Sequence, residues 1–582
     1  MANPPRELFS HLPHPTLDRP PQGCYHIRVR ILYYGDNLDI LRKHLQDETV
    51  DLIYLDPPFN SQRDYNLLFK EQSGEPAQAQ IRAFTDTWQW SERAYHQFIE
   101  ECPNDRLRKL VQGFVESLGR NEMTAYLVMM APRLVELHRV LKPTGSLYLH
   151  CDPTASHYLK VMMDMIFGPR NFRNEIVWKR TSAHSGAKRW GPVHDVLLFY
   201  TKSNAYTWNT VYTDYDPDYV KKFFRYEDEQ GRYRLHDLTG AGIRHGDSGR
   251  PWKGVDPTRV GRHWAVPNAL VESVVGKERA AEMTVQEKLD ALEEAGFILW
   301  PERGSVPRYK HYLSMNPGTI VQDVITDIQP ISAHAKERLG YPTQKPLALL
   351  ERIIQASSNE GDVVMDPFCG CGTAVVAAEK LHRNWIGIDI THLAISLIKY
   401  RLSDMFDLKE HKDYEVIGEP VTVQDARELA HTDRNEFQRW AIGLIPRARP
   451  YQDKKGADTG IDGILYFKDD ASDPKKVVIQ VKSGHVSVAH IRDFAHVIAR
   501  EKATLGLFVT LEEPTRAMLT EADVMGFYTT PLGNIPIPRL QIRTIEQLLN
   551  GEGFHIPSAA LLLGVQQADA TPRDPQQQRL KL

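Results

Sequence analysis

Residues 363–373 read Val-Val-Met-Asp-Pro-Phe-Cys-Gly-Cys-Gly-Thr, and this stretch decides the fold of the longest part of the chain. Val363 to Met365 has the apolar character of a buried strand, and a helical pattern runs from Thr373 to Leu381. The glycines between them allow a tight turn close to a ligand, because they lack a Cβ. A strand, a glycine turn and a helix predict an open α/β sheet that binds ligands at the carboxyl ends of its strands.

The alternation of strands and helices continues on both sides of this unit. We expect strands at 28–34, 50–55, 146–150, 175–178, 195–200 and 385–388, and helices at 37–45, 124–141, 157–166, 347–357 and 393–402. Lys142 to Gly145 predicts a turn at the end of the long helix. Repeated strand–helix units predict a Rossmann-like α/β domain, with a parallel sheet covered on both faces.

Composition sets wide limits. A chain of 582 residues is too long for one core, and three or four domains are expected. A net charge of -4 does not indicate a protein that coats nucleic acid, although a local basic surface is still possible. No apolar run approaches the roughly 18 residues of a membrane span, and the start lacks a signal-peptide core, so a cytoplasmic protein without membrane partners is expected. Five scattered cysteines give no zinc motif.

A second motif, Leu55-Asp56-Pro57-Pro58-Phe59-Asn60, follows another expected strand. An exocyclic amine on an aromatic base is a poor nucleophile, because its lone pair is delocalised into the ring. The Asp56 carboxylate and the Pro57 carbonyl can accept hydrogen bonds from its two hydrogens and free the lone pair, and consecutive prolines fix the backbone that aims them. Phe59 can stack on a base swung out of a duplex. The motif therefore favours chemistry on an amino group.

Two further acids are expected at strand ends. Asp389 lies 17 residues after Gly372, near the spacing of roughly twenty residues at which an acid meets ribose hydroxyls in nucleotide-binding βαβ units. Asp36 ends the strand that precedes the Asp56 strand. S-adenosylmethionine has a ribose but no phosphate, so a site for it needs no basic residue to hold a phosphate. The turn 369–373 contains none.

The two motifs in this order resemble the β arrangement of the N6-adenine and N4-cytosine DNA methyltransferases, from about Arg30 to Leu402 apart from much of an insert. The resemblance implies that S-adenosylmethionine is the cofactor and that Asp56 to Phe59 are catalytic, namely Asp56, Pro57, Pro58 and Phe59. It also implies a set of cofactor-binding residues: Asp366, Phe368, Gly370, Gly372 and Thr373 at the turn, Asp389 at the ribose, Asp36 at the adenine, and Gln344 and Lys345 at the methionine end.

The sequence departs from this family at Cys371, where serine is frequent, and cysteine is small enough to fit. Aspartate in the first motif favours adenine, because N4-cytosine enzymes more often carry serine there. Cytosine N4 therefore stays open as the alternative target, and methylation of protein or RNA is a more distant one.

The segment 181–329 interrupts the α/β rhythm with glycine, proline, aromatic and basic residues. Thr284 to Glu287 predicts a capping box for one helix in it. The resemblance places target recognition in this insert, through side chains such as Arg180, Trp190, Trp252 and Trp264. The alternative for each is a core or solvated residue of an accessory lobe.

We expect a flexible arm at 1–24, the methyltransferase domain at 25–405, a charged linker at 406–429, a second α/β domain at 430–552 and a disordered tail at 566–582. In the second domain, Asp462 precedes a hairpin whose return strand carries Gln480 and Lys482. These residues resemble the PD-(D/E)xK nucleases in their Mrr-like form.

That resemblance implies that Asp462 and Gln480 hold Mg²⁺, with Glu436 as a further ligand, and that Lys482 assists hydroxide formation. The alternative is a degenerate domain that only binds DNA or partners. The sequence thus predicts a DNA-adenine methyltransferase of restriction–modification or phage defence, fused to a nuclease-like domain. Double-stranded DNA is the expected partner; other defence subunits and a homodimer stay open, as does a non-catalytic DNA-binding regulator.

Overall fold

The computed structural model describes residues 29–58, 64–70, 76–85, 90–181, 188, 190–301, 306–315, 318–332, 335, 337–339, 341, 343–451, 460–469, 474–531, 534–557 and 561–562. The expected arm, the expected tail and Phe59 lie outside these residues. The chain divides into two compact units, one of 1–209 with 323–582 and one of 210–322. Each is described by itself.

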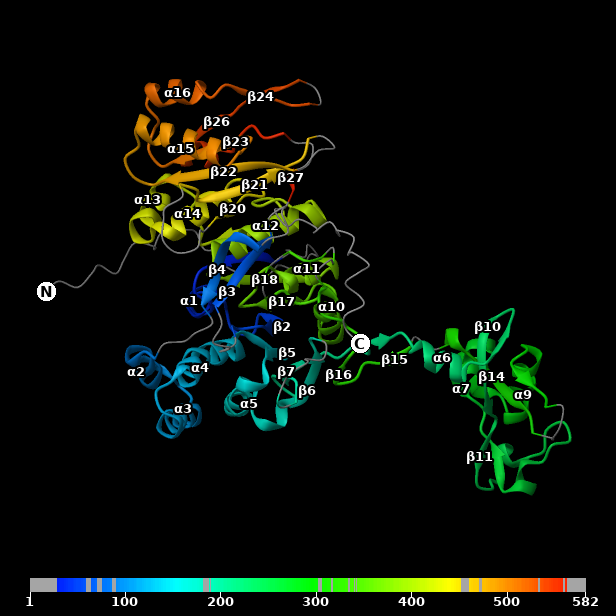
Figure 1. The fold of residues 1–582 in the computed structure, drawn as a ribbon. Helices are drawn as coiled ribbons and strands as arrows, with labels where there is room; N and C mark the ends of the chain where they lie inside the picture. Colours follow the sequence, from blue (N-terminus) through cyan, green and yellow to red (C-terminus); the bar gives the residue numbers. More distant parts are fainter. Residues whose placement is uncertain are drawn as a thin grey trace, which may run out of the picture. The chain divides into compact units, whose positions relative to one another are not determined.

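The first unit contains a nine-stranded sheet (Figure 1). In spatial order its strands are β16 (Val324–Ile325), β6 (Phe172–Lys179), β7 (His194–Thr201), β5 (Leu141–Cys151), β2 (Val50–Leu55), β17 (Val363–Asp366), β18 (Asn384–Asp389), β1 (Arg30–Tyr34) and β19 (Glu415–Ile417). The expectation of a parallel sheet needs one correction, because β7 runs antiparallel to β5 and β6. An apolar strand has the same composition in either direction, so its direction was not predictable.

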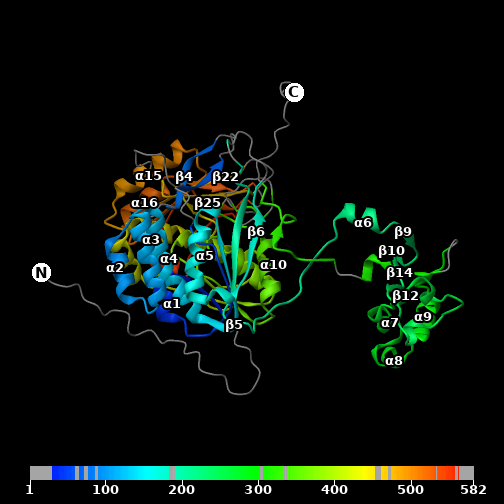
Figure 2. The same ribbon diagram turned by 90° about the horizontal axis from the view of Figure 1, so that it is seen from below.

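Helices cover both faces of this sheet, as expected for strands that are apolar on both sides. On one face α1 (Asn37–His44), α4 (Glu122–Val140) and α5 (Pro153–Phe167) pack against Ile53 and Leu55. On the other face α10 (Leu347–Ser357), α11 (Thr373–Lys380) and α12 (His392–Phe406) pack against Leu52 and Tyr54. Figure 2 separates the two faces, with α4 and α5 on one side of β5 and α10 on the other.

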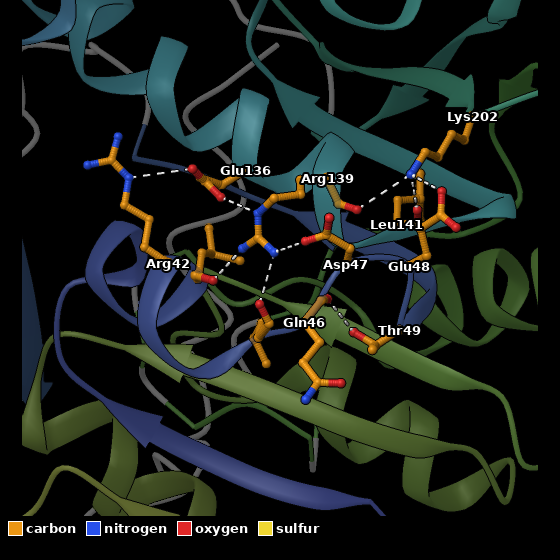
Figure 3. Close-up of polar contacts among 11 residues, drawn as sticks. Arg42, Gln46, Asp47, Glu48, Thr49, Glu136, Arg139, Leu141 and Lys202 are labelled. Carbon is orange, nitrogen blue, oxygen red and sulfur yellow. Dashed lines mark hydrogen bonds and ion pairs between the residues drawn. The ribbon is translucent and has the colours of Figure 1, made fainter. Parts of the chain in front are cut away.

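The predicted turn at Lys142 to Gly145 is wrong, because these residues lie inside β5 at an irregularity in its pairing with β2. A Cβ on Gly145 would lie 2.5 Å from the Leu141 side chain, so this position favours glycine. Arg139, at the end of α4, fixes the connection before β2 by donating to the carbonyls of Leu41 and Leu45 and pairing with Asp47 at 2.6 Å (Figure 3). Lys202 donates to the Leu141 carbonyl at 2.6 Å in the same group.

The structure contains several elements that the sequence did not predict. The structure adds the helices α2 (Glu92–Glu101) and α3 (Asp105–Leu118), the antiparallel pair β3 (Asp64–Lys70) and β4 (Pro76–Thr85), and a short helix η1 (Pro169–Asn171). The segment 406–429, expected to be a linker, contains β19, which joins the sheet edge in parallel with β1. A three-residue strand in a charged segment gives too short a pattern to recognise.

The second unit has its own small core. Its main sheet orders β13 (Ile298–Leu299), β14 (Arg308–Tyr312), β10 (Gly231–Asp237) and β9 (Tyr226–Asp228), and β11 (Thr239–Ala241) pairs with β12 (Arg262–Trp264). The helices are α6 (Pro217–Phe223), α7 (Asn268–Val275), α8 (Lys277–Glu282) and α9 (Val285–Glu294). The capping box at Thr284 is confirmed, and it starts α9. The unit also contains the short helices η2 (Asp247–Gly249), η3 (Pro257–Val260) and η4 (Leu313–Met315). Its strand β8 (Tyr212–Thr213) pairs with β15 (Thr319–Ile320).

The C-terminal part of the first unit has a separate mixed sheet. Its order is β20 (Arg449–Pro450), β21 (Gly463–Phe467), β22 (Lys475–Lys482), β23 (Leu505–Thr510) and β26 (Leu540–Thr544), with β27 (Leu561–Leu562) beside β21. One core lies under α13 (Val423–Thr432), α14 (Arg434–Gly443) and α17 (Ile545–Leu549), and the other under α15 (Val488–Arg500) and α16 (Arg516–Asp523). The hairpin predicted between Asp462 and Gln480 is confirmed as β21–β22, and β24 (Phe527–Thr529) pairs with β25 (Pro536–Pro538).

Among the residues described, no helix is both long and apolar enough to cross a membrane.

Candidate functional site

A cavity of about 490 Å³ opens at the carboxyl ends of β2, β17 and β18. Its volume is within the range of roughly 300–1,000 Å³ that holds a small-molecule ligand or cofactor. The sequence motifs expected to act together meet here although they are far apart in the chain. The lining includes Asp36, Asp56, Pro57, Pro58, Gln344, Lys345, Asp366, Phe368, Gly370, Thr373 and Asp389.

Asp56 lies just beyond the end of β2 and forms an ion pair with Lys345. Both side chains are largely buried. The sequence reasoning placed Lys345 near the methionine end of a cofactor and did not foresee this pair. The ammonium also makes a hydrogen bond to the Thr343 carbonyl at 3.3 Å, which anchors it to the segment before α10.

Asp366 and Asp389 supply the acidic wall of the cavity. Burial raises the pKa of Asp366 well above its ordinary value, although a hydrogen bond from the Phe368 N–H opposes this. Burial also raises the pKa of Asp389. The Asp389 carboxylate accepts from the Gly370 N–H at 2.9 Å and from the Thr391 N–H at 2.9 Å, so it holds the glycine turn as well as facing the cavity.

The glycine turn borders the cavity through Cys369, Gly370 and Cys371. Gly370 and Gly372 both have a positive φ, at 48° and 75°. A Cβ on Gly372 would lie 2.6 Å from the Ile398 side chain, so that residue serves helix packing against α12. Gln344 is tied into its own segment: its side chain donates to the Glu337 carbonyl and accepts from the Leu339 N–H.

Arg133 of α4 is a site residue that the sequence reasoning missed. Its guanidinium pairs with the Asp36 carboxylate at 2.7 Å and donates to Asn37 Oδ1 at 2.6 Å, and all three residues line the cavity. Asp36 also caps α1 by accepting from the Leu38 N–H. No local pattern marks Arg133, because its partners lie nearly a hundred residues earlier.

A chain of buried polar groups was also missed. Tyr54, His150 and Asp195 are hydrogen-bonded in series, and Arg180 pairs with Asp195 at 3.1 Å. Tyr54, Asp195 and Arg180 line the cavity. Of the residues expected to recognise DNA, Arg180 is thus beside the cavity, and Trp190 is almost fully exposed. Trp252 and Trp264 are buried in the core of the second unit, which supports the core alternative for both.

The second predicted site lies at the end of the β21–β22 hairpin. The Asp462 carboxylate accepts from the Val481 N–H at 2.7 Å, which holds it against β22. The Gln480 side chain donates to the Gly460 carbonyl at 3.1 Å, and its oxygen is buried without a hydrogen-bond partner in the described part of the chain. Lys482 follows two residues later, on the same face of the strand as Gln480.

Glu436, expected as a further metal ligand, lies in the first turn of α14 and pairs with Arg439 of the same helix. Among the residues described, no group of three or more histidine, cysteine, aspartate or glutamate side chains could hold a metal ion. A site here would therefore use few protein ligands. The roles of Asp462, Gln480, Glu436 and Lys482 stay predictions.

Residues 50–400 match the family model of the N6/N4 DNA methylases. The chain belongs to this family. Residues 429–526 match a second model, the catalytic domain of the Mrr-like restriction endonucleases. The methylase family with a C-terminal Mrr-like domain is the architecture predicted from the sequence.

Curated relatives share parts of the methylase region. The Type II methyltransferase M.EcaI of Enterobacter cloacae is 33% identical over 282 residues, which are 48% of this chain and 58% of the relative. The Type III restriction-modification enzyme StyLTI Mod subunit of Salmonella typhimurium is 28% identical over 365 residues, 60% of this chain and 49% of the relative. The chain thus spans about half the length of these two proteins.

The DNA adenine methyltransferase YhdJ of Escherichia coli is 24% identical over 387 residues, 65% of this chain and 86% of the relative. Among solved structures, a putative DNA modification methylase of Thermus thermophilus complexed with S-adenosyl-L-methionine aligns with 67% of this chain and 99% of its own, at 14% identity and a TM-score of 0.31.

Proposed function

We propose that the methylase domain transfers a methyl group from S-adenosylmethionine to adenine N6 in DNA. One observation carries the proposal: Asp56, Pro57 and Pro58 line the same cavity as Asp366 and Asp389. The acceptors proposed for the amine and the carboxylates proposed for the cofactor therefore line one cavity. Holding two reactants in line is the main source of rate that such a site can supply.

The cavity fits S-adenosylmethionine by its chemistry. The cofactor carries ribose hydroxyls, amino groups and a sulfonium but no phosphate, and the wall offers the carboxylates of Asp366, Asp389 and Asp36. Asp389 would hold the ribose, Asp36 the adenine, and the segment of Gln344 and Lys345 the methionine end. When bound, the cofactor supplies the methyl group.

Asp56 then acts on the substrate. Its carboxylate accepts one hydrogen of the amine and the Pro57 carbonyl accepts the other, so the nitrogen lone pair is available to the methyl carbon. The ion pair with Lys345 does not prevent this, because a carboxylate has about four lone-pair sites and can accept from an ammonium and an amine together. Lys345 would hold the Asp56 carboxylate in its orientation.

Two observations support adenine over cytosine as the target. The first motif carries aspartate, where N4-cytosine enzymes more often carry serine. A relative with the printed name DNA adenine methyltransferase aligns over most of its own length. N4 of cytosine is the alternative.

We further propose that the Mrr-like domain cuts DNA with Mg²⁺. The Gln480 oxygen, buried and without a partner in the described residues, and the Asp462 carboxylate offer hard oxygen ligands. Mg²⁺ commonly keeps several waters and takes few protein oxygens. Lys482 would stabilise the developing hydroxide. The alternative is a domain that binds DNA or a partner subunit and cuts nothing.

Double-stranded DNA is the proposed substrate of both domains, with the insert reading the target sequence. A nuclease joined to a methylase is compatible with a living host only if methylation controls cutting, which places the chain in restriction–modification or phage defence.

The test is to express the chain in a host that lacks DNA methylation and to sequence its DNA with detection of modified bases. We expect N6-methyladenine at one recurrent sequence, and its loss in Asp56→Ala. Modified cytosine at a recurrent sequence would favour the alternative target. Unmodified DNA, with the protein present and folded, would contradict the proposal.

A further inference from the structure

A chain of polar side chains, linked by two hydrogen bonds and one ion pair, crosses four neighbouring strands at the cavity end of the sheet. The Tyr54 hydroxyl of β2 lies 2.8 Å from His150 Nδ1 of β5. His150 Nε2 lies 3.2 Å from one oxygen of Asp195 in β7. The other Asp195 oxygen lies 3.1 Å from Nε of Arg180, just after β6. Together these residues are called the polar chain below.

Three members of the polar chain, Tyr54, His150 and Asp195, are buried in an otherwise apolar layer. Tyr54 and Asp195 are each 2% exposed, and His150 is fully buried. Their neighbours on the same sheet face include Leu52, Leu197 and Phe199. Apolar side chains of similar size would be at least as stable there, because a buried polar network gains little net free energy even when it is fully hydrogen-bonded. Stability alone therefore does not account for these residues.

The position of the polar chain beside the cavity accounts for these residues. Tyr54 lies in β2, two residues before Asp56, which directly follows the strand. Tyr54, Asp195 and Arg180 all line the cavity with Asp56. The Trp178 ring meets His150 edge to face at 5.9 Å, and its indole N–H donates to the Ile328 carbonyl, so the imidazole is held by a fixed neighbour.

The partners also act on Asp195. Burial tends to raise the pKa of Asp195, but its hydrogen bond with His150 and the nearby cationic side chains of Lys345 and Arg180 outweigh burial and lower that pKa. Both ring nitrogens of His150 are engaged, Nε2 with Asp195 and Nδ1 with the Tyr54 hydroxyl.

These contacts restrict Tyr54. Burial, together with the charges of Asp56, Asp366 and Asp195, raises the pKa of its phenol, which therefore keeps its proton at neutral pH. The hydrogen bond with His150 holds the hydroxyl in place, and the side chain cannot leave this position without breaking that bond.

We propose that His150 and Asp195 are positioning residues for methyl transfer, which act through Tyr54 on the end of β2 that presents Asp56. At its other end the polar chain holds Arg180 at the cavity, where the 43% exposed side chain can meet the backbone of the target strand. The polar chain thus links the group beside the amine with a cation that can contact DNA. This inference rests on the proposed methyl transfer and adds residues that neither sequence motif contains.

The molecule supplies a matched control in Tyr148. It pairs directly with Tyr54 across β2 and β5, is equally buried, and makes one buried hydrogen bond, to Ser357 at 2.7 Å. It does not line the cavity. Tyr54→Phe and Tyr148→Phe therefore each remove one buried hydroxyl and its hydrogen bond, and they differ in their distance from the reaction.

The experiment uses the full chain, labelled S-adenosylmethionine and unmethylated DNA of mixed sequence, and it measures the single-turnover transfer rate, the cofactor dissociation constant and the melting temperature. We expect Tyr54→Phe to lower the rate roughly tenfold, since one hydrogen bond lost only in positioning corresponds to about that factor, with an unchanged cofactor constant. Tyr148→Phe should lower the melting temperature similarly and leave the rate unchanged.

Asp195 provides the second test. Asp195→Asn keeps one acceptor oxygen and should retain more of the rate than Asp195→Ala, at equal cofactor affinity. If the parent protein transfers the methyl group and Tyr54→Phe keeps the parental rate, the proposed role of the polar chain is wrong. The proposed function would still stand. Equal rate losses in Tyr54→Phe and Tyr148→Phe would also overturn the role of the polar chain, because they would show only a common loss of stability.

Discussion

The two candidate sites are assembled in opposite ways. The methylase cavity gathers residues from several strands, from α4 and from the segment before α10, and Asp56 and Lys345 pair in it although 289 residues separate them. The Mrr-like site comes from one hairpin, in which Asp462 contacts the strand that carries Gln480 and Lys482. The first site exists only when a whole sheet has formed, whereas the second needs little more than two paired strands.

This difference affects how each site can fail. In the methylase cavity burial raises the pKa of Asp366 and Asp389, and Lys345 is the cation that pairs with Asp56. A single substitution there changes the electrostatics of its neighbours. In the hairpin site the groups are few, and a substitution removes one ligand or one charge. Substitutions in the two sites should therefore separate the two activities.

The largest expected effect is in Asp56→Ala. Methyl transfer should be abolished, because the amine loses its acceptor, while cofactor affinity stays near the parental value. Asp51→Asn, in β2 and away from the cavity, is the control. Filter assays with labelled cofactor and calorimetry measure the two quantities. Loss of cofactor binding in Asp56→Ala would mean that the roles of the two motifs are exchanged.

Lys482→Ala should stop Mg²⁺-dependent cleavage and leave methylation unchanged. Lys476→Ala is its control, since Lys476 lies at the other end of β22 and pairs with Glu501. Cleavage of methylated and unmethylated DNA, over a range of Mg²⁺ and Mn²⁺ concentrations, gives the readout. Absence of cutting by the parent under all these conditions would favour a DNA-binding or docking module.

Asp389→Ala should weaken cofactor binding by about 1.5–3 kcal/mol, the value of a hydrogen bond to a charged group, or roughly ten- to a hundredfold in the dissociation constant. The Gly370 and Thr391 N–H groups donate to different oxygens of Asp389, so Asp389→Asn removes the charge but keeps an acceptor for one of them, and it should weaken binding less than Asp389→Ala. Calorimetry compares the two variants. An unchanged constant in Asp389→Ala would show that another acid carries the ribose.

The smallest effect is on stability. Burial raises the pKa of Asp366, so its contribution to stability is present below the ordinary pKa and is lost as pH rises through the folded value. Asp366→Asn removes that loss and keeps the acceptor for the Phe368 N–H. Its melting temperature should exceed the parental one by a few degrees at pH 7 and by less at pH 4. A lower melting temperature at pH 7 would contradict this reading of the cavity.

Much of the methylase sheet was predictable because apolar periodicity is local. The strand at 50–55 and the helix at 347–357 have the predicted bounds. The reversed direction of β7 and the three-residue β19 were not predictable, since neither leaves a distinctive local pattern.

The residues of the candidate site also fall into two groups, those that the sequence predicts and those that it does not. Asp56, Asp366 and Asp389 stand in motifs whose chemistry can be read from a few adjacent residues, and the cavity brings them together. Arg133, His150 and Asp195 stand in no motif. Each becomes recognisable only through a partner far away in sequence, such as Asp36 for Arg133 and Tyr54 for His150.

The most direct test of the proposed function identifies the product nucleoside. Purified chain is incubated with unmethylated double-stranded DNA and methyl-labelled S-adenosylmethionine, the DNA is digested to nucleosides, and mass spectrometry locates the label. Transfer by the Asp56 site to adenine predicts labelled N6-methyldeoxyadenosine, absent with Asp56→Ala. Label in N4-methyldeoxycytidine, or a label that persists in Asp56→Ala, would contradict it.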